Sequence, residues 1–153
     1  MILRPVTEKD ASVLWTWRND PTAYAHYFHP TTVTWETHLV WLRERLTDPS
    51  VRIWIAEVPP ETKVGVVRFE PTGNPDEMRI GVSLDASCRG RGLGTRLIRE
   101  GTERLFRETD CIRVRAEVFR SNSTSGAAFR SAGYVPADDD PAQPWFALVR
   151  TRG

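Results

Sequence analysis

The sequence predicts a mixed α/β domain, with a central mixed β-sheet flanked by about four helices on both faces. Segments that alternate apolar and polar residues, as strands do, occur both before and after a helix that follows a glycine-rich turn. The chain has 153 residues, which is close to the usual size of one domain. We therefore expect a single domain over residues 1–153.

Two helices are predicted in the N-terminal third. Thr7 and Asp10 have the spacing of a capping box for the first helix. This helix is expected to end before Pro21, because the residue before a proline disfavours helical conformation. Thr34 precedes the second helix, whose apolar stripe is Trp35, Leu39, Leu42 and Leu46.

Period-two alternation predicts the strands, and the clearest run extends from Met78 to Leu84. Further strands are expected at 51–56, 64–69, 112–118 and 145–149, with loops at 71–76 and 136–141. Two helices separate the later strands. The first has the apolar side Leu97, Ile98, Gly101 and Leu105. The second runs from Thr124 to Ala132, and Gly133 suits the left-handed residue that ends a helix.

Composition excludes several classes of protein. The net charge of +1 argues against nucleic-acid binding driven by counterion release. There is neither a signal peptide nor a run of about eighteen apolar residues, so we expect a cytoplasmic protein with no membrane partner. Two cysteines cannot form a disulfide framework. The chain has three histidines, but a zinc site would have no third ligand at a credible spacing, so no metal is expected. Either a monomer or a homodimer is compatible with the sequence.

The most informative segment joins the clearest strand to the next helix and reads Arg89-Gly90-Arg91-Gly92-Leu93-Gly94-Thr95. Glycine lets a ligand approach the backbone, and the first N–H groups of a helix have no internal partner. With the positive end of the helix dipole, they form a site for a phosphate or pyrophosphate. A glycine-rich turn that binds nothing is the alternative.

Two common phosphate loops fit this segment poorly. A nucleoside-triphosphate P-loop needs Lys followed by Ser or Thr after its last glycine, where this chain has Thr95-Arg96. A dinucleotide fingerprint needs G-x-G-x-x-G, and the segment is G-x-G-x-G.

Arg89-x-x-Gly92-x-Gly94 resembles the pyrophosphate loop of the GNAT superfamily of N-acetyltransferases, which bind acetyl-CoA. Met78 to Leu84 is similar to the family's central strand, whose backbone pairs with the pantetheine arm, and Gly133-Tyr134 is similar to its Gly-aromatic pair. The resemblance covers nearly the whole chain. It implies a GNAT-like fold, acyltransferase activity on a primary amine, and acetyl-CoA as cofactor. The implied cofactor-binding residues are Val82, Ser83, Leu84, Arg89, Gly90, Arg91, Gly92, Leu93, Gly94, Thr95, Asn122, Ser125 and Phe129.

Acetyl transfer requires a neutral amine, so a general base is useful. Glu117 is the first candidate, because Glu117 to Asn122 resembles the E-V-x-x-S-N motif of ribosomal-protein alanine N-acetyltransferases. Glu70 and Glu77 are weaker candidates. The family often has a tyrosine seven residues after the asparagine as the acid that reprotonates the thiolate, and this chain has Phe129 there. The predicted substitutes are Ser125, Tyr134 or water.

The acceptor site is predicted near the end of the first helix, where aromatic residues gather. The candidate substrate-binding residues are Trp17, Arg18, Tyr24, Tyr27 and Phe28. Trp17-Arg18-Asn19 and Thr34-x-Glu36-x-His38-x-x-Trp41 resemble a GNAT branch that includes amino-sugar acetyltransferases, which implies a nucleotide-linked amino sugar as acceptor. A protein N-terminus, another small amine, and a non-catalytic acetyl-CoA-binding module are the alternatives.

Overall fold

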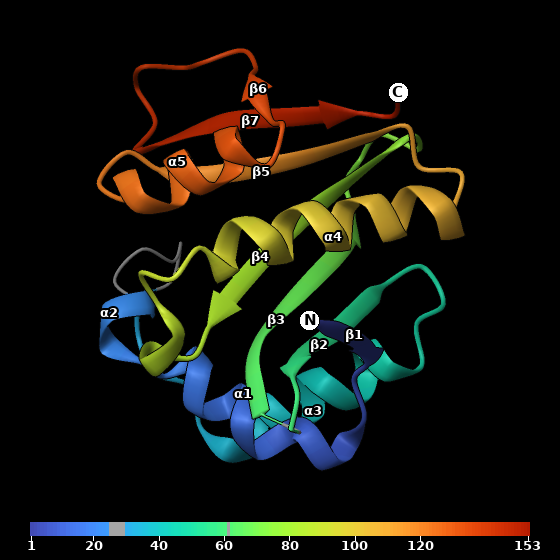
Figure 1. The fold of residues 1–153 in the computed structure, drawn as a ribbon, viewed down its shortest axis with the longest axis vertical. Helices are drawn as coiled ribbons and strands as arrows, with labels where there is room; N and C mark the ends of the chain where they lie inside the picture. Colours follow the sequence, from blue (N-terminus) through green and yellow to red (C-terminus); the bar gives the residue numbers. More distant parts are fainter. Residues whose placement is uncertain (25–29, 61) are drawn as a thin grey trace.

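A computed structural model describes residues 1–24, 30–60 and 62–153. Its centre is a seven-stranded sheet in the order β1-β2-β3-β4-β5-β7-β6 (Figure 1). Only β4 and β5 pair in parallel, and the other neighbours are antiparallel. The strands are β1 (Ile2–Pro5), β2 (Arg52–Val58), β3 (Thr62–Pro71), β4 (Glu77–Leu84), β5 (Arg113–Phe119), β6 (Val135–Pro136) and β7 (Trp145–Thr151).

Helices cover both faces of this sheet, which confirms the predicted fold class. On one face, α1 and α3 enclose a core with β2 and β3. On the other face, α4 and α5 enclose the larger core. The helices are α1 (Ala11–Arg18), α2 (Pro21–Tyr24), α3 (Trp35–Leu46), α4 (Leu93–Glu108) and α5 (Ser123–Ser131), with 3₁₀ turns η1 (Glu8–Asp10) and η2 (Ala86–Cys88). No helix in the described part of the chain is long and apolar enough to cross a membrane.

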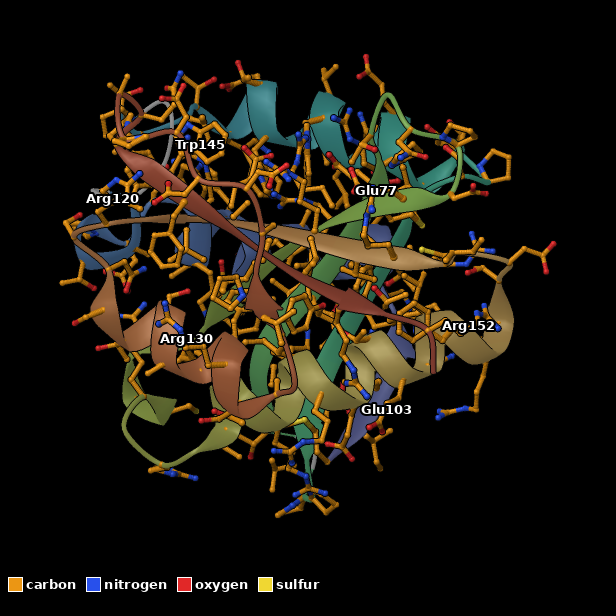
Figure 2. The ribbon with its side chains drawn as sticks, turned by 90° about the horizontal axis from the view of Figure 1, so that it is seen from above. Glu77, Glu103, Arg120, Arg130, Trp145 and Arg152 are labelled. Carbon is orange, nitrogen blue, oxygen red and sulfur yellow. The ribbon has the colours of Figure 1, made fainter. Side chains whose placement is uncertain are left out.

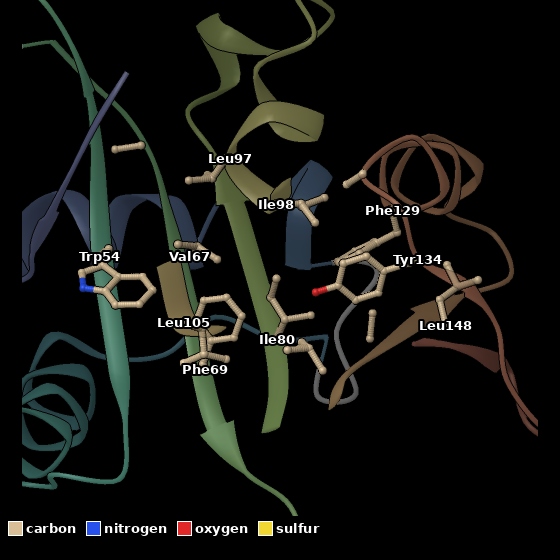
Figure 3. Packing of buried hydrophobic residues seen from close by; sticks show 14 of the residues in the cluster. Trp54, Val67, Phe69, Ile80, Leu97, Ile98, Leu105, Phe129, Tyr134 and Leu148 are labelled. Atoms are coloured by element: carbon tan, nitrogen blue, oxygen red, sulfur yellow. The ribbon is translucent and has the colours of Figure 1, made fainter. Parts of the chain in front are cut away.

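The apolar side predicted for α4 is the one that it buries. Figure 3 shows Leu97, Ile98 and Leu105 of this helix beside Val67 and Phe69 of β3. The fourth residue of the stripe, Gly101, lets the helix approach the sheet closely, because a Cβ there would lie 3.1 Å from a methyl carbon of Val67. The glycine-rich loop at the start of α4 is therefore held against the sheet by a well-packed helix.

The predicted helix starts are confirmed in part. The backbone N–H of Thr7 donates to Asp10 Oδ2 at 2.8 Å, as in a capping box, but the turn that follows is 3₁₀ and α1 begins at Ala11. Thr34 caps α3 as predicted by accepting from the N–H of Thr37. The last residue of the predicted apolar stripe of α3, Leu46, lies outside the core, whereas Leu42 is buried. Leu46 is exposed in the last turn, beyond the core where α3 meets α1.

Three elements were not predicted: β1, α2 and β6. Each has four residues or fewer, so none offers enough positions for a periodic pattern.

Candidate active site

The parallel strands β4 and β5 pair over only three residue pairs and then diverge. Their register joins Glu77–Arg79 to Arg113–Arg115. Beyond these pairs, β4 stays paired with β3 as far as Leu84, and β5 stays paired with β7 as far as Phe119. Figure 1 shows the two strands separating toward their C-terminal ends. We call the diverging segments 80–84 and 116–119 the fork.

The β4 part of the fork, residues 80–84, pairs with no described strand on the side that faces β5. Val82, Ser83 and Leu84, which were predicted to bind the cofactor, belong to this segment and are half-buried. A ligand rich in amides can pair with such an edge as an added strand would. This part of the backbone therefore fits the pantetheine arm of a coenzyme A thioester.

The glycine-rich loop adjoins the fork at the start of α4. Gly90 and Gly92 have φ values of +76° and +75°, which side chains other than glycine rarely adopt. A Cβ at either glycine would have no atom of the described residues within 4 Å apart from its neighbours in the chain, so these residues leave space above the loop. Gly92 precedes the sixteen-residue helix α4, and no side chain of the described residues caps its N-terminus. These N–H groups and the helix dipole suit a pyrophosphate.

The two arginines of the loop have different environments. Arg89 points toward the junction of α1 and α2, where it donates to Thr22 Oγ1 at 2.6 Å and to Asp20 Oδ2 at 2.8 Å. Arg91 is exposed and forms no ion pair with the residues that the structure describes. Arg91 is thus better placed than Arg89 to meet a phosphate.

Trp17 belongs to the protein core. It is buried between α1 and the sheet, and its indole Nε1 donates to Asp85 Oδ2 at 2.8 Å. Hydrogen bonds from Ser87 and from Trp17 hold the pKa of the Asp85 carboxyl below its usual range. This geometry gives Trp17 a structural use in the core, which was the alternative to its predicted place in the acceptor site.

The remaining predicted acceptor residues are only partly described. Arg18 donates through Nη1 to the carbonyl of Thr31 at 2.9 Å. Tyr24 ends α2, and its side chain is not described, whereas Tyr27 and Phe28 lie outside the described residues.

On the other side of the fork, Asn122 and Ser125 form the start of α5. The Asn122 side chain caps the helix by accepting from the Ser125 N–H at 3.2 Å. Phe129, one turn further on, is buried, and its ring packs edge-to-face on Tyr134 with centroids 5.1 Å apart. Ser125 is half-buried in the first turn.

Tyr134 is enclosed in the core, as Figure 3 shows, with 2% of its surface exposed. Its hydroxyl lies 2.7 Å from Thr102 Oγ1 of α4, which is also buried. Burial raises the pKa of the Tyr134 phenol above its usual range. This environment favours a packing role for Tyr134 over the acid role predicted from the sequence.

Glu117 lies on β5 within the fork. Its neighbours Ala116 and Val118 face the core under α4 and α5, so Glu117 faces the opposite side of the sheet. Its Oε1 lies 3.9 Å from Arg79 Nη1 and 3.9 Å from Arg115 Nε, and 16% of its side chain is exposed.

The two weaker base candidates, Glu77 and Glu70, lie closer to arginine nitrogens than Glu117 does. Glu77 accepts a 2.7 Å hydrogen bond from Arg113 Nε at the paired end of the strands, outside the fork. Glu70 lies on β3 within 3.3 Å of Arg45 Nε and 3.4 Å of Arg68 Nε. Glu117 is thus the one of the three that lies on the fork.

The sequence profile of the acetyltransferase (GNAT) domain matches residues 1–135. The chain belongs to the GNAT family of acetyltransferases. This membership confirms the predicted family and the acyltransferase class, with acetyl-CoA as the cofactor. A comparison with curated proteins gives no match.

Several solved structures share the fold of this chain. The aminoglycoside acetyltransferase AAC(6')-Ib in complex with coenzyme A and kanamycin is 25% identical, with a TM-score of 0.81 over 98% of this chain and 94% of that chain. The spermidine N-acetyltransferase from Vibrio cholerae in complex with CoA and spermine is 13% identical, with a TM-score of 0.84 over 97% and 92%. A domain from Methanocaldococcus jannaschii is 21% identical, with a TM-score of 0.83 over 99% and 97%.

Proposed function

We propose that this GNAT enzyme transfers the acetyl group of acetyl-CoA directly to the primary amine of a small molecule, with Glu117 as the general base. The observation that carries the proposal is the fork, where β4 diverges from β5 beside the glycine loop and the Glu117 carboxylate lies on β5. The 25% identical aminoglycoside acetyltransferase, which was solved with coenzyme A and kanamycin, supports a small amine as acceptor.

In this proposal, the residues in and beside the fork have separate roles in binding and proton transfer. Backbone N–H groups on the edge of β4 that faces β5 orient the thioester and stabilise the oxyanion that forms when the amine attacks. Glu117 takes the amine proton, directly or through water, because an alkyl amine with a pKa near 10.4 is less than about 0.1% neutral at pH 7. Arg91 and the N-terminus of α4 hold the pyrophosphate.

The leaving thiol needs little help from the protein. A free thiol has a pKa of about 8.5, so the thiolate is a good leaving group and water can reprotonate it. Ser125, half-buried at the start of α5, is the remaining side-chain candidate for this role. The buried environment of Phe129 and Tyr134 favours packing as the role of both residues.

For the acceptor, the sequence resemblance favours a nucleotide-linked amino sugar, with a protein N-terminus as the alternative. The motif behind the sugar proposal also has structural uses. Asn19 exchanges two hydrogen bonds with the backbone of Val33, at 2.9 and 3.0 Å, and Arg18 bonds Thr31. Because Arg18 and Asn19 have these structural uses, the proposal rests on the small-amine class rather than on one acceptor.

The test is the pH–rate profile of Glu117→Gln on the best amine found in a broad panel. Loss of a general base typically costs about 100- to 10,000-fold in rate, and the loss should shrink as the pH rises and the free amine grows. Glu103→Gln is the matched control, because Glu103 is also paired with an arginine, Arg150, but lies on α4 on the opposite side of the sheet (Figure 2).

A Glu117→Gln enzyme within about threefold of wild type at pH 7 would contradict the base assignment. Tight acetyl-CoA binding without transfer to any amine would instead support a non-catalytic module.

A further inference from the structure

Arginine side chains gather on the face of the sheet where Glu117 lies. In Figure 2, Trp145 and Glu77 lie on the α3 side of the sheet, whereas Arg130 and Glu103 lie on the side of α4 and α5. The Arg115 guanidinium lies 5.9 Å from the centre of the Trp145 ring and so belongs to the α3 side. We define the arginine cluster as Arg45, Arg68, Arg79 and Arg115, from the last turn of α3 and from β3, β4 and β5.

The cluster borders the fork directly. Arg79 and Arg115 form the last residue pair of β4 and β5 before the strands diverge. Two positions further along β4 is Gly81, where a Cβ would lie 2.8 Å from Arg68 Nη2. The missing side chain therefore leaves room for a guanidinium to lie over the β4 backbone inside the fork.

Positive charge exceeds negative charge at this place. Among the described residues of the sheet, the carboxylates within 4.0 Å of a nitrogen of the cluster are Glu70 and Glu117. Glu70 is shared by Arg45, Arg68 and Arg79, while Glu117 is shared by Arg79 and Arg115. The exposed Glu44 also approaches Arg45, at 3.7 Å. Even with Glu44 included, four guanidiniums face three carboxylates.

The ion pairs nearest the fork are loose. The nitrogens of Arg79 lie 3.8 Å from Glu70 and 3.9 Å from Glu117, and Arg115 Nε also lies 3.9 Å from Glu117. These separations exceed the roughly 2.7–2.9 Å of a charge-assisted hydrogen bond. With 46% of the Arg79 side chain and 27% of the Arg115 side chain exposed, both guanidiniums have donors to offer a ligand.

We propose that the acceptor is an amine that also carries an anionic group, a carboxylate or a phosphate, which Arg79 and Arg115 bind while the amine reaches Glu117. The planar donor fork of arginine matches the geometry of both anions. This inference rests on the proposed acetyl transfer and specifies its substrate class. It also separates this chain from the solved relatives bound to kanamycin and to spermine, because an arginine-rich face repels polycations.

The test compares amines that differ only in the anionic group. Ethanolamine is paired with phosphoethanolamine and β-alaninamide with β-alanine, so that the two pairs distinguish phosphate from carboxylate recognition. Spermidine and kanamycin represent polycations. Release of the CoA thiol gives kcat/KM for each acceptor. We expect at least one anionic member to exceed its neutral partner about tenfold or more, since hydrogen bonds to charged groups are worth about 1.5–3 kcal/mol.

Arg79→Gln and Arg115→Gln should each reduce this preference severalfold, through a higher KM for the anionic acceptor. Arg107→Gln, which removes an exposed arginine at the end of α4, should leave the preference unchanged. A preference for polycations, equal rates within each pair, or a preference that survives both cluster variants would overturn the inference.

Calorimetry on the CoA complex measures the affinity of the proposed anion site without depending on turnover. Phosphoethanolamine or β-alanine should bind wild type about tenfold or more tightly than the double variant Arg79→Gln/Arg115→Gln. If neither anionic amine binds, the inference fails. If binding follows this order but no amine is acetylated, the proposed acetyl transfer fails and the anion site remains.

Discussion

The contact between Tyr134 and Thr102 allows a test that separates packing from catalysis. Tyr134→Phe removes a buried hydroxyl and leaves Thr102 Oγ1, itself inaccessible to solvent, without this partner. An unsatisfied buried polar group costs about 1–3 kcal/mol. In a protein of this size, each kcal/mol lowers Tm by roughly 2–4 °C, so we expect a fall of about 2–12 °C.

Thr102→Val should be destabilising for the same reason, because it leaves the phenol unsatisfied. The double variant, Tyr134→Phe with Thr102→Val, replaces both partners by apolar groups of similar shape and should recover much of the loss. Urea unfolding followed by circular dichroism gives the coupling free energy, expected within about 0.5–3 kcal/mol. Additive losses in the double variant would show that the hydrogen bond is not the source of the effect.

The same variants report on the chemistry. If Tyr134 only packs, Tyr134→Phe should retain kcat within about twofold at temperatures where it is folded. The removal of a catalytic acid would instead cost about 100-fold or more. A loss of that size in a variant of unchanged stability would restore Tyr134 as the acid and refute the structural argument.

Two further predictions concern the cofactor loop and α3. Gly92→Val places a branched side chain on a residue with φ +75°, in the space above the loop. The affinity for acetyl-CoA, measured by calorimetry, should therefore fall about tenfold or more. The control is Gly73→Val, in an open loop without positive φ, which should leave this affinity unchanged. Unchanged affinity in a folded Gly92→Val protein would mean that the pyrophosphate lies elsewhere. His38 is 5% exposed and burial lowers its pKa, so the free energy of unfolding should be highest above the unfolded-state pKa of about 6.5 and should decline as the pH falls through and below that value. His38→Phe should flatten this decline in urea titrations between about pH 7 and pH 5, and an identical slope in both proteins would rule out His38 as its source.

Periodic segments were predictable because their pattern is local. The stripe of α4 and the alternation of β4 were both read from neighbouring residues, and both elements lie where they were expected. Gly133, predicted to end α5, has a φ of +96°. The glycine loop was recognisable for the same reason, since a helix start, its preceding strand and its glycines are contiguous in the sequence.

The properties that depend on register were not predictable. Arg79 and Arg115 are neighbours only because β4 and β5 pair at that point, and nothing in either segment specifies how far the pairing continues. The burial of the two aromatic residues predicted to act in the site could not be predicted from the sequence either. Trp17 and Tyr134 are amphipathic side chains that the sequence interpretation placed at the site, but their polar atoms are satisfied inside the protein by Asp85 and Thr102.

These hidden contacts also connect the cofactor side of the site to the acceptor side. Asp85 follows the last residue of β4 and accepts from Trp17 of α1, while Arg89 of the glycine loop bonds Asp20 and Thr22 just beyond that helix. The hydrogen bonds from Ser87 and Trp17 that lower the pKa of Asp85 keep it an anion near Arg89. The end of α1 is therefore held in place by two residues, Asp85 and Arg89, of the segment that joins β4 to the glycine loop. An acceptor that docks beside α1 would meet a surface whose position is tied to the glycine loop, which gives Arg89 a structural use in a loop where Arg91 already offers a positive charge to a phosphate.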